Sequence, residues 1–313
     1  TDLNPKAGQA KYKRITRRVE MQLSQWRSSG HFLTVDGQQV FYKAEGTGPV
    51  LLLIHGYPTA SFDWARMWPA LTNLFHCVTL DMPGFGFSDK APKKYLIKEQ
   101  AATISEVIRH LGITSAHVLS RDYGDTVAQE MMAQQLENNL AFRIESLHLL
   151  NGGLFPETHR ALFIQKLLLS PIGGLLIRLL NKNAIRKSMH NIFGPNTPPS
   201  NQDIDDFWTL ISANNGHKYM HLLLDYMKQR KQYRERWVSA LQNANVPLRL
   251  TAGMADPISG AHMVARYKQL IPNADVIELN KIGHYPQIEC AEAVVNSITN
   301  FCVATLTKRK TLS

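Results

Sequence analysis

The sequence predicts an α/β fold in which a mainly parallel sheet is covered by helices on both faces and carries an inserted helical cap. Short, continuously apolar runs recur along the chain, and most are separated by stretches long enough for a helix. This rhythm stops between 151 and 247, where Leu, Met, Lys, Arg and His at helical spacing replace the strands. The expected strands are VLLLIHG (50–56), HCVTLD (76–81), HVLSRD (117–122), ESLHLLN (145–151), PLRLTAG (247–253) and DVIELN (275–280).

The expected domain organisation follows from these segments. Residues 31–46 alternate apolar and polar side chains around Asp36-Gly37, a pattern typical of an antiparallel hairpin. The 313 residues, 44% of them hydrophobic, suffice for one large domain with an inserted subdomain. We expect an N-terminal basic helix over 1–29, an α/β core made of 30–154 and 241–313, and a helical cap over 155–240.

Basic residues are concentrated near the two ends of the sequence. The net charge is +10, with basic clusters in KYKRITRR (11–18) and TKRK (307–310). Apolar residues recur at near-helical spacing from 15 to 26, among the basic ones. This segment is therefore either a helix lying on anionic lipid or a terminal helix packed on the body with a solvated basic face. Nucleic acid is not an expected partner, because no aromatic-interleaved binding motif joins the two basic ends.

Composition indicates a soluble, cytoplasmic protein, with peripheral contact to an anionic membrane left open. The most apolar stretch, 167–180, is interrupted by Pro171, two glycines and Arg178, whereas a membrane-spanning helix needs about 20 apolar residues. The three cysteines show no CxxC spacing, which favours free thiols in a reducing compartment.

The first candidate catalytic residue is Asp122, at a predicted corner between a strand and a helix. Ser120 and Gly124 place small residues two positions before and after it, as a sharp, strained strand-to-helix turn requires. The N-terminus of the following helix would favour the ionised, nucleophilic carboxylate. The alternative interpretation is that Asp122 simply caps that helix.

Two further residues complete a catalytic pattern. Asp256 and His284 each follow a predicted strand, in TAGMADPIS and NKIGHYPQIE. The chain order of nucleophile, acid and histidine is that of hydrolases with a strand-turn-helix elbow. All three positions lie beyond the C-terminal ends of strands, where open α/β sheets place their sites. This combination favours catalysis over simple helix capping for Asp122.

The motif His55-Gly56-Tyr57-Pro58 follows the first apolar strand and predicts an oxyanion hole. Gly56 allows a close approach of the backbone, and the N–H groups of Tyr57 and Tyr123 would supply two donors. His55 is expected to support the loop by hydrogen bonding, with Pro58 completing the motif.

No cofactor or metal site is expected. Gly84-x-Gly86 lacks the third glycine of a dinucleotide-binding fingerprint, because Asp89 occupies that position. The 12 His and 3 Cys show no metal-ligand spacing.

Four motifs together resemble the α/β-hydrolase superfamily, in the branch that contains epoxide hydrolases and haloalkane dehalogenases. They are HGYPTASFDW, DMPGFGFSD, the aspartate elbow and GHYPQIE. NGGLFPETH (151–159), with the FGP and RW segments further on, resembles the mesoderm-specific transcript proteins of that branch. The resemblance covers about 30–308 and implies a two-step mechanism. Asp122 attacks an electrophilic carbon to give an alkyl-enzyme ester, and His284, oriented by Asp256, activates the water that hydrolyses it.

Departures from the family pattern bear on the substrate. Tyr123 and Tyr57 occupy positions where many haloalkane dehalogenases hold the halide with Trp and Asn, which argues against dehalogenation. Epoxide hydrolases donate protons from two cap tyrosines. Tyr226 matches the second by its spacing, with an expected phenol pKa near 10, but the first has no counterpart because residues 124–218 contain no tyrosine. An ordinary place on an amphipathic helix remains the alternative for Tyr226.

Arg121 occupies the position before the nucleophile, where relatives usually have His. Its charge could depress the pKa of Asp122, or it could pair structurally with Asp125 or Asp81.

These inferences favour a hydrolase with an aspartate nucleophile that opens an epoxide of a small, apolar-to-amphipathic substrate. The alternatives are a haloalkane dehalogenase and a non-catalytic or membrane-associated protein that keeps the fold for binding. The sequence does not indicate substrate identity, stereochemistry or oligomeric state.

Overall fold

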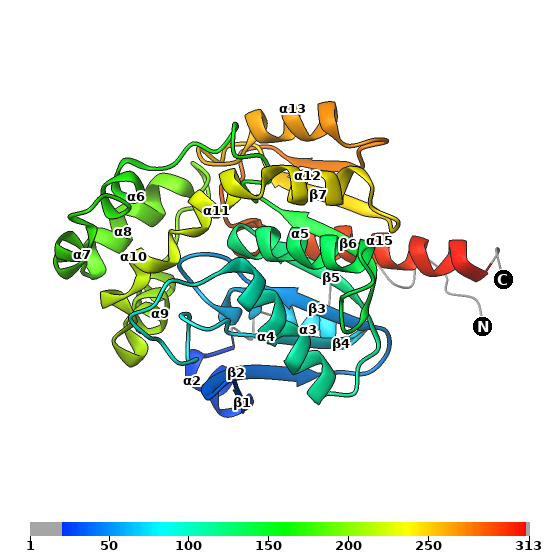
Figure 1. The fold of residues 1–313 in the computed structure, drawn as a ribbon, viewed down its shortest axis with the longest axis horizontal. Coiled ribbons are helices and arrows are strands. Elements are labelled where there is room, and N and C mark those ends of the chain that lie inside the picture. The colour runs from blue at the N-terminus through cyan, green and yellow to red at the C-terminus, as the bar shows by residue number, and fades with distance from the viewer. Residues whose placement is uncertain (1–20, 311–313) are drawn as a thin grey trace.

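A sheet of eight strands forms the centre of the molecule (Figure 1). The structure, a computed structural model, describes residues 21–310, with side chains described to residue 305. The strand order is β1-β2-β4-β3-β5-β6-β7-β8. The strands are β1 (His31–Val35), β2 (Gln38–Glu45), β3 (Val50–Ile54), β4 (His76–Leu80), β5 (Ser115–Arg121), β6 (Arg143–Leu150), β7 (Leu248–Gly253) and β8 (Val276–Leu279).

The strand pairing confirms the predicted mainly parallel sheet. β3 to β8 pair in parallel, and all six predicted apolar strands are present. β1 and β2 form the predicted antiparallel hairpin, and β2 joins the sheet antiparallel to β4. Because the carboxyl ends of the parallel strands meet at one edge, the loops after β3, β5, β6, β7 and β8 converge there.

Two hydrophobic clusters cover the two faces of the sheet. In β3, Leu52 and Ile54 belong to one cluster, and Leu51 and Leu53 to the other. A strand buried on both faces needs apolar residues at every position, which explains the unbroken run VLLLI. The first face carries α4 (Ile97–His110), α5 (Tyr123–Leu136), α12 (Arg234–Gln242) and α13 (Ala261–Leu270), and the second carries η1 (Ser61–Trp64), α3 (Trp68–Thr72) and α15 (Ala291–Lys310). The short helix α14 (Pro286–Glu289) contacts η1 and α15.

The described part of the N-terminal segment packs on the body. α2 (Leu23–Ser28) places Trp26 fully inside the second cluster, where its indole N–H donates to Ser61 Oγ at 3.2 Å. The Lys43 ammonium lies 5.5 Å from the centre of the Trp26 ring. These contacts agree with the packing interpretation for residues 23–28. The basic cluster at 11–18 lies outside the described residues.

The segment between β6 and β7 contains helices and loops and no strand. At the left of Figure 1 these helices form a layer beyond the carboxyl edge of the sheet. None of the helices within residues 21–310 is long and apolar enough to cross a membrane. The three cysteines, Cys77, Cys290 and Cys302, form no disulfide and are free thiols. The connecting helices that precede α12 are α6 (Phe163–Leu168), α7 (Gly173–Leu176), η2 (Ile177–Leu179), α8 (Lys182–Ile192), α9 (Asn201–Ser212), η3 (Ala213–Lys218), α10 (Met220–Leu223) and α11 (Tyr226–Gln232).

A fully buried histidine, His148, lies in β6. Its Nε2 is 2.8 Å from Thr251 Oγ1, and its ring meets the edge of Phe301. Burial, assisted by the charge of Arg249, lowers the pKa of His148 to about 3. The unfolded chain therefore binds a proton at His148 that the folded chain rejects, throughout the interval between the ordinary pKa of 6.5 and about 3.

We predict that His148→Gln makes stability less dependent on pH. The contribution of neutral His148 is fully present above pH 6.5 and is lost as the pH falls through this interval. In urea unfolding, the slope of the unfolding free energy against pH should decrease by about 1.4 kcal/mol per pH unit in the variant. An unchanged slope would show that His148 is protonated in the folded protein.

Candidate active site

Asp122 occupies a strained corner between β5 and α5. Its backbone lies at φ 47° and ψ −106°, in a region that non-glycine residues rarely adopt. A Cβ on Gly124 would lie 2.4 Å from the His55 carbonyl oxygen, and one on Gly56 would lie 2.8 Å from the Asp122 Cβ. The small residues are therefore required by close packing around the corner, as the sequence predicts for an elbow.

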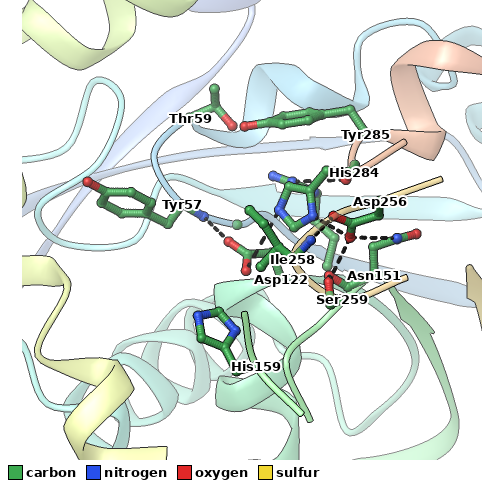
Figure 2. Close-up of polar contacts among 12 residues, drawn as sticks. Tyr57, Thr59, Asp122, Asn151, His159, Asp256, Ile258, Ser259, His284 and Tyr285 are labelled. Atoms are coloured by element: carbon green, nitrogen blue, oxygen red, sulfur yellow. Dashed lines mark hydrogen bonds and ion pairs between the residues drawn. The ribbon is translucent and has the colours of Figure 1, made fainter. Parts of the chain in front are cut away.

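The Asp122 side chain does not cap α5. No cap hydrogen bond from it is present, and its Oδ2 instead accepts from the Tyr57 N–H at 2.9 Å (Figure 2). The capping alternative is therefore wrong, and the carboxylate faces the loop after β3. The N–H of Tyr57 that was predicted for the oxyanion hole is directed at this carboxylate.

Asp256 and His284 lie beside Asp122. His284 Nδ1 is 2.8 Å from Asp256 Oδ2, which also accepts from Asn151 Nδ2 at 2.9 Å and from Ser259 Oγ at 2.8 Å (Figure 2). Burial opposes ionisation of Asp256, but the charge and hydrogen bonds of His284 and the Asn151 amide outweigh it and lower the pKa of the carboxyl. A charged Asp256 fixes Nδ1 of His284 as the donor and leaves Nε2 free to accept a proton.

The gap between His284 and Asp122 distinguishes this site from a serine triad. Nε2 of His284 lies 3.9 Å from Oδ1 of Asp122, which is beyond hydrogen-bond distance. A serine nucleophile needs a base in contact with its hydroxyl, whereas a carboxylate has no proton to give up. His284 is therefore available to activate a water molecule instead.

His55 and Pro58, the other residues of the predicted oxyanion loop, shape the backbone of that loop. Nδ1 of His55 donates to the Gly56 carbonyl at 3.0 Å, because its Nε2 accepts the Met82 N–H at 3.1 Å. Burial lowers the pKa of His55 to about 3, so this histidine is neutral. Pro58 follows Tyr57 through a cis peptide bond.

Tyr123 is the first residue of α5. Its ring is buried, and the centre of the ring lies 5.2 Å from the centre of the Phe85 ring. Its N–H group was predicted to be the second oxyanion donor, and that role stays a prediction. No group of His, Cys, Asp or Glu side chains in the part of the chain that the structure describes is arranged to hold a metal ion.

Arg121 is fully buried and lies against His284 and Tyr285. Its Nη1 pairs with Asp63 Oδ2 at 3.1 Å, and its guanidinium lies 3.9 Å from the centre of the Tyr285 ring. Its Nη2 donates to the His284 carbonyl at 3.4 Å. Burial raises the pKa of Asp63 to about 6, although Arg121 favours the charged carboxylate, so the pair is ionic at neutral pH.

The predicted partners of Arg121 were wrong. Asp125 accepts from Ser120 Oγ at 2.5 Å, and Asp81 accepts from the backbone N–H groups of Ser61 and Phe87. The structural interpretation of Arg121 holds with a different carboxylate, which η1 supplies from the HGYPTASFDW motif. An ion pair between residues so far apart in sequence could not be assigned from spacing.

Tyr226, at the start of α11, lies near the Asp122 corner. Its ring is buried, with its centre 5.0 Å from that of Tyr123 and 6.4 Å from that of Tyr57. Burial and then the negative charge of Asp122 raise its pKa above the ordinary value. The expected pKa near 10 was therefore wrong, and the phenol stays protonated more firmly than its sequence context indicated.

Sequence reasoning missed Arg230, four residues further along α11. Its guanidinium lies 4.5 Å from the Tyr226 ring centre, donates from Nε to Thr126 Oγ1 at 2.7 Å and donates from Nη2 to the Asp122 carbonyl at 3.0 Å. None of the ion pairs of the described residues includes it. The spacing of four from Tyr226, which puts both on one helix face, was the available signal.

His159, the last residue of NGGLFPETH, was also missed. Its Nδ1 lies 3.5 Å from Arg230 Nη1. Because a guanidinium can only donate, Nδ1 accepts and Nε2 carries the proton. Burial and the Arg230 charge lower the pKa of His159 to about 3, so the ring is neutral. In Figure 2 the ring extends towards Asp122, and its buried Nε2 has no hydrogen-bond partner among the described residues.

A protein-family model described as the alpha/beta hydrolase fold matches residues 49–291. This chain belongs to that family. The hydrolase is 41% identical to the mesoderm-specific transcript homolog protein of Bos taurus, over 89% of this chain and 87% of the relative. It is 34% identical to the putative hydrolase LipZ of Mycobacterium tuberculosis, over 89% and 97%. These matches confirm the predicted family resemblance.

More distant matches are to proteins with named activities. A cis-3-alkyl-4-alkyloxetan-2-one decarboxylase of Shewanella oneidensis is 25% identical, over 88% of this chain and 89% of the relative. The haloalkane dehalogenase DbeA of Bradyrhizobium elkani has a TM-score of 0.77 at 20% identity, over 90% and 99%. The epoxide hydrolase CorEH has a TM-score of 0.74 at 19% identity, over 88% and 98%. The solved structures confirm the fold.

We predict that Asp63→Asn destabilises the hydrolase by about 3–5 kcal/mol, because it leaves the Arg121 charge buried without a counter-charge. Urea unfolding at neutral pH measures this loss. Replacing both residues by apolar ones, in Asp63→Leu with Arg121→Met, should cost much less. A double variant as unstable as the single one would show that the packing of η1, and not the charge, requires Asp63.

Proposed function

We propose that this hydrolase attacks an electrophilic carbon with Asp122 and then hydrolyses the resulting ester with His284 and Asp256, its preferred substrate being an epoxide. The observation that carries the proposal is the position of the Asp122 carboxylate. It lies at a strained elbow, accepts the Tyr57 N–H and stands 3.9 Å from the histidine that a second step requires.

In the first step, a carboxylate oxygen of Asp122 forms a bond to a ring carbon of the epoxide while the bond from that carbon to the ring oxygen breaks. The electron pair moves to the ring oxygen, which stays attached to the substrate and needs a proton. The Tyr226 hydroxyl is the proposed donor, because the phenol is held protonated beside the nucleophile.

In the second step, Nε2 of His284 takes a proton from water, and the hydroxide forms a bond to the ester carbonyl carbon. The N–H groups of Tyr57 and Tyr123 would hold the oxyanion of the tetrahedral intermediate. The bond between the carbonyl carbon and the ester oxygen that carries the substrate then breaks. This oxygen takes the proton from His284 and leaves as part of the diol. The carboxylic acid left on Asp122 gives its proton to solvent and returns to a carboxylate, and solvent returns a proton to the Tyr226 phenolate.

His159 supplies a second donor for the epoxide oxygen, in place of the missing first cap tyrosine. Its Nε2–H is buried and unpartnered within the described residues, and the ring lies close enough to Asp122 for the charge of that carboxylate to act on the pKa of His159. A departing halide requires no proton, so a pair of neutral donors favours oxygen-ring opening over dehalogenation.

A four-membered lactone ring is a second candidate substrate. The Shewanella relative named for an oxetan-2-one matches nearly the whole chain. Such a ring also presents a strained carbon–oxygen bond, but its opening at the alkyl carbon releases a carboxylate, which requires no proton. The dependence on Tyr226 therefore separates the two ring types.

We predict that His284→Gln traps the ester intermediate. Intact-mass measurement after incubation with a reactive epoxide should show one substrate added to the protein, because attack by Asp122 does not require the histidine. Asp122→Ala should show no adduct. Turnover by the Asp122 variant would identify another nucleophile, and an unmodified His284 variant across epoxides, haloalkanes and β-lactones would favour a binding protein that retains the fold.

We predict that Tyr226→Phe slows ester formation from an epoxide by about 10²- to 10⁴-fold in a single turnover, because the ring oxygen loses its proton donor. Haloalkane or β-lactone reactions, if present, should change far less. His159→Leu should also slow epoxide opening, whereas His159→Gln, which keeps an N–H near the Nε2 position, should retain most of the rate. Equal rates in the parent and Tyr226→Phe proteins would remove Tyr226 from the mechanism.

A further inference from the structure

Large apolar side chains are exposed together at the outer end of the cap. Nine such residues are exposed in the described chain, and five of them lie within seventeen consecutive positions. We call these five the cap apolar surface. They are Phe163 at 79%, Ile164 at 43%, Ile172 at 54%, Leu175 at 64% and Leu179 at 73% exposure.

These five side chains point away from the body of the hydrolase. The buried residues of α6, α7 and η2 are Gln165, Leu168, Gly173 and Ile177, whereas the five residues of the cap apolar surface are exposed. In Figure 1, α6 and α7 lie at the left end of the molecule, far from α15. Exposed apolar side chains gathered at one end of a cap mark an interaction surface rather than scattered surface residues.

The charged side chains of the segment that carries this surface, residues 158–202, are all basic. Residues 158–202 contain no Asp or Glu. They contain six Lys or Arg, of which Lys182 pairs with Asp205 from outside the segment. Lys166, Arg178 and Lys187 are exposed. Apolar residues that alternate with basic ones, and that lack any acidic neighbour in sequence, match the chemistry of an anionic lipid surface.

We propose that the cap apolar surface docks this hydrolase on an anionic lipid bilayer, with its apolar side chains inserted among the headgroups and the basic residues against the lipid anions. A second copy of the chain is a poorer occupant, because a symmetric contact would bring two positive rims together. Insertion is peripheral, since α6, α7 and η2 are far shorter than a membrane-spanning helix.

Docking in this way would place the catalytic site near the lipid. His159 precedes Phe163 by four residues, so the two Cα atoms are at most about 14 Å apart. An apolar substrate dissolved in the bilayer would therefore leave it close to Asp122. This consequence rests on the proposed function, whereas docking itself does not.

Vesicle flotation of the full chain tests the proposal. The protein should float with vesicles that contain phosphatidylserine and much less with phosphatidylcholine alone, and the binding should weaken from low to physiological salt. Replacing Phe163, Leu175 and Leu179 by Ser should reduce partitioning at least about 10-fold, because their apolar area no longer leaves water. Each of Lys166→Gln, Arg178→Gln and Lys187→Gln should reduce it up to about five-fold.

Matched controls separate this surface from other sources of binding. Phe32→Ser with Leu74→Ser removes exposed apolar residues elsewhere and should leave flotation unchanged. Replacing the basic residues of 11–18 by Gln tests the N-terminal segment. If that change abolishes flotation while the triple Ser variant floats normally, the proposal is wrong. Equal binding to both vesicle types, or a dimer in solution that only the triple Ser variant disrupts, would also overturn it.

Turnover of a freely soluble substrate by the triple Ser variant distinguishes the two proposals. Normal turnover with lost flotation supports docking independently of the chemistry. Intact flotation of a protein that attacks no electrophile would leave docking in place and remove the proposed reaction.

Discussion

The strained backbone of Asp122 is the constraint around which the site is built. A corner at φ 47° and ψ −106° persists only if neighbouring groups hold it. The Tyr57 N–H holds the side chain, and the Arg230 guanidinium holds the carbonyl oxygen of the same residue. Gly56 and Gly124 let the loop after β3 and the first turn of α5 close around it. The loop, the sheet and the cap thus meet at one residue.

Two buried guanidinium groups flank this corner with different consequences. Arg121 has a carboxylate partner in Asp63, so its charge is largely compensated, and it joins the end of β5 to the backbone of His284. Within residues 21–310, the hydrogen bonds of Arg230 are to the neutral oxygens of Thr126 and Asp122 and to His159. Its charge therefore acts on the aromatic and imidazole groups above Asp122. There it adds to burial in keeping His159 neutral, and its N–H group determines which imidazole nitrogen carries the proton.

Sequence patterns predicted the sheet and the order of the triad, because both follow from local rules. Unbroken apolar runs mark strands buried on two faces, and Gly124 marks a corner where a Cβ does not fit. The contacts of Arg121 and His159 follow instead from how distant segments pack, and the residues near them in sequence do not predict their partners. The pKa of Tyr226 was misjudged for the same reason, since its burial and its distance from Asp122 are set by the docking of α11.

The position of Tyr226 links the strength of an acid to the progress of the reaction. After burial, the carboxylate of Asp122 is the main influence that makes this phenol hold its proton. In the proposed first step that carboxylate becomes a neutral ester, so the electrostatic penalty on a tyrosinate falls while a more basic oxygen is formed nearby. The Tyr226 phenol is thus a weak acid while Asp122 is a carboxylate, and a stronger acid once Asp122 has become an ester. Hydrolysis of the ester restores the charge and draws the proton back, which resets the acid for the next cycle.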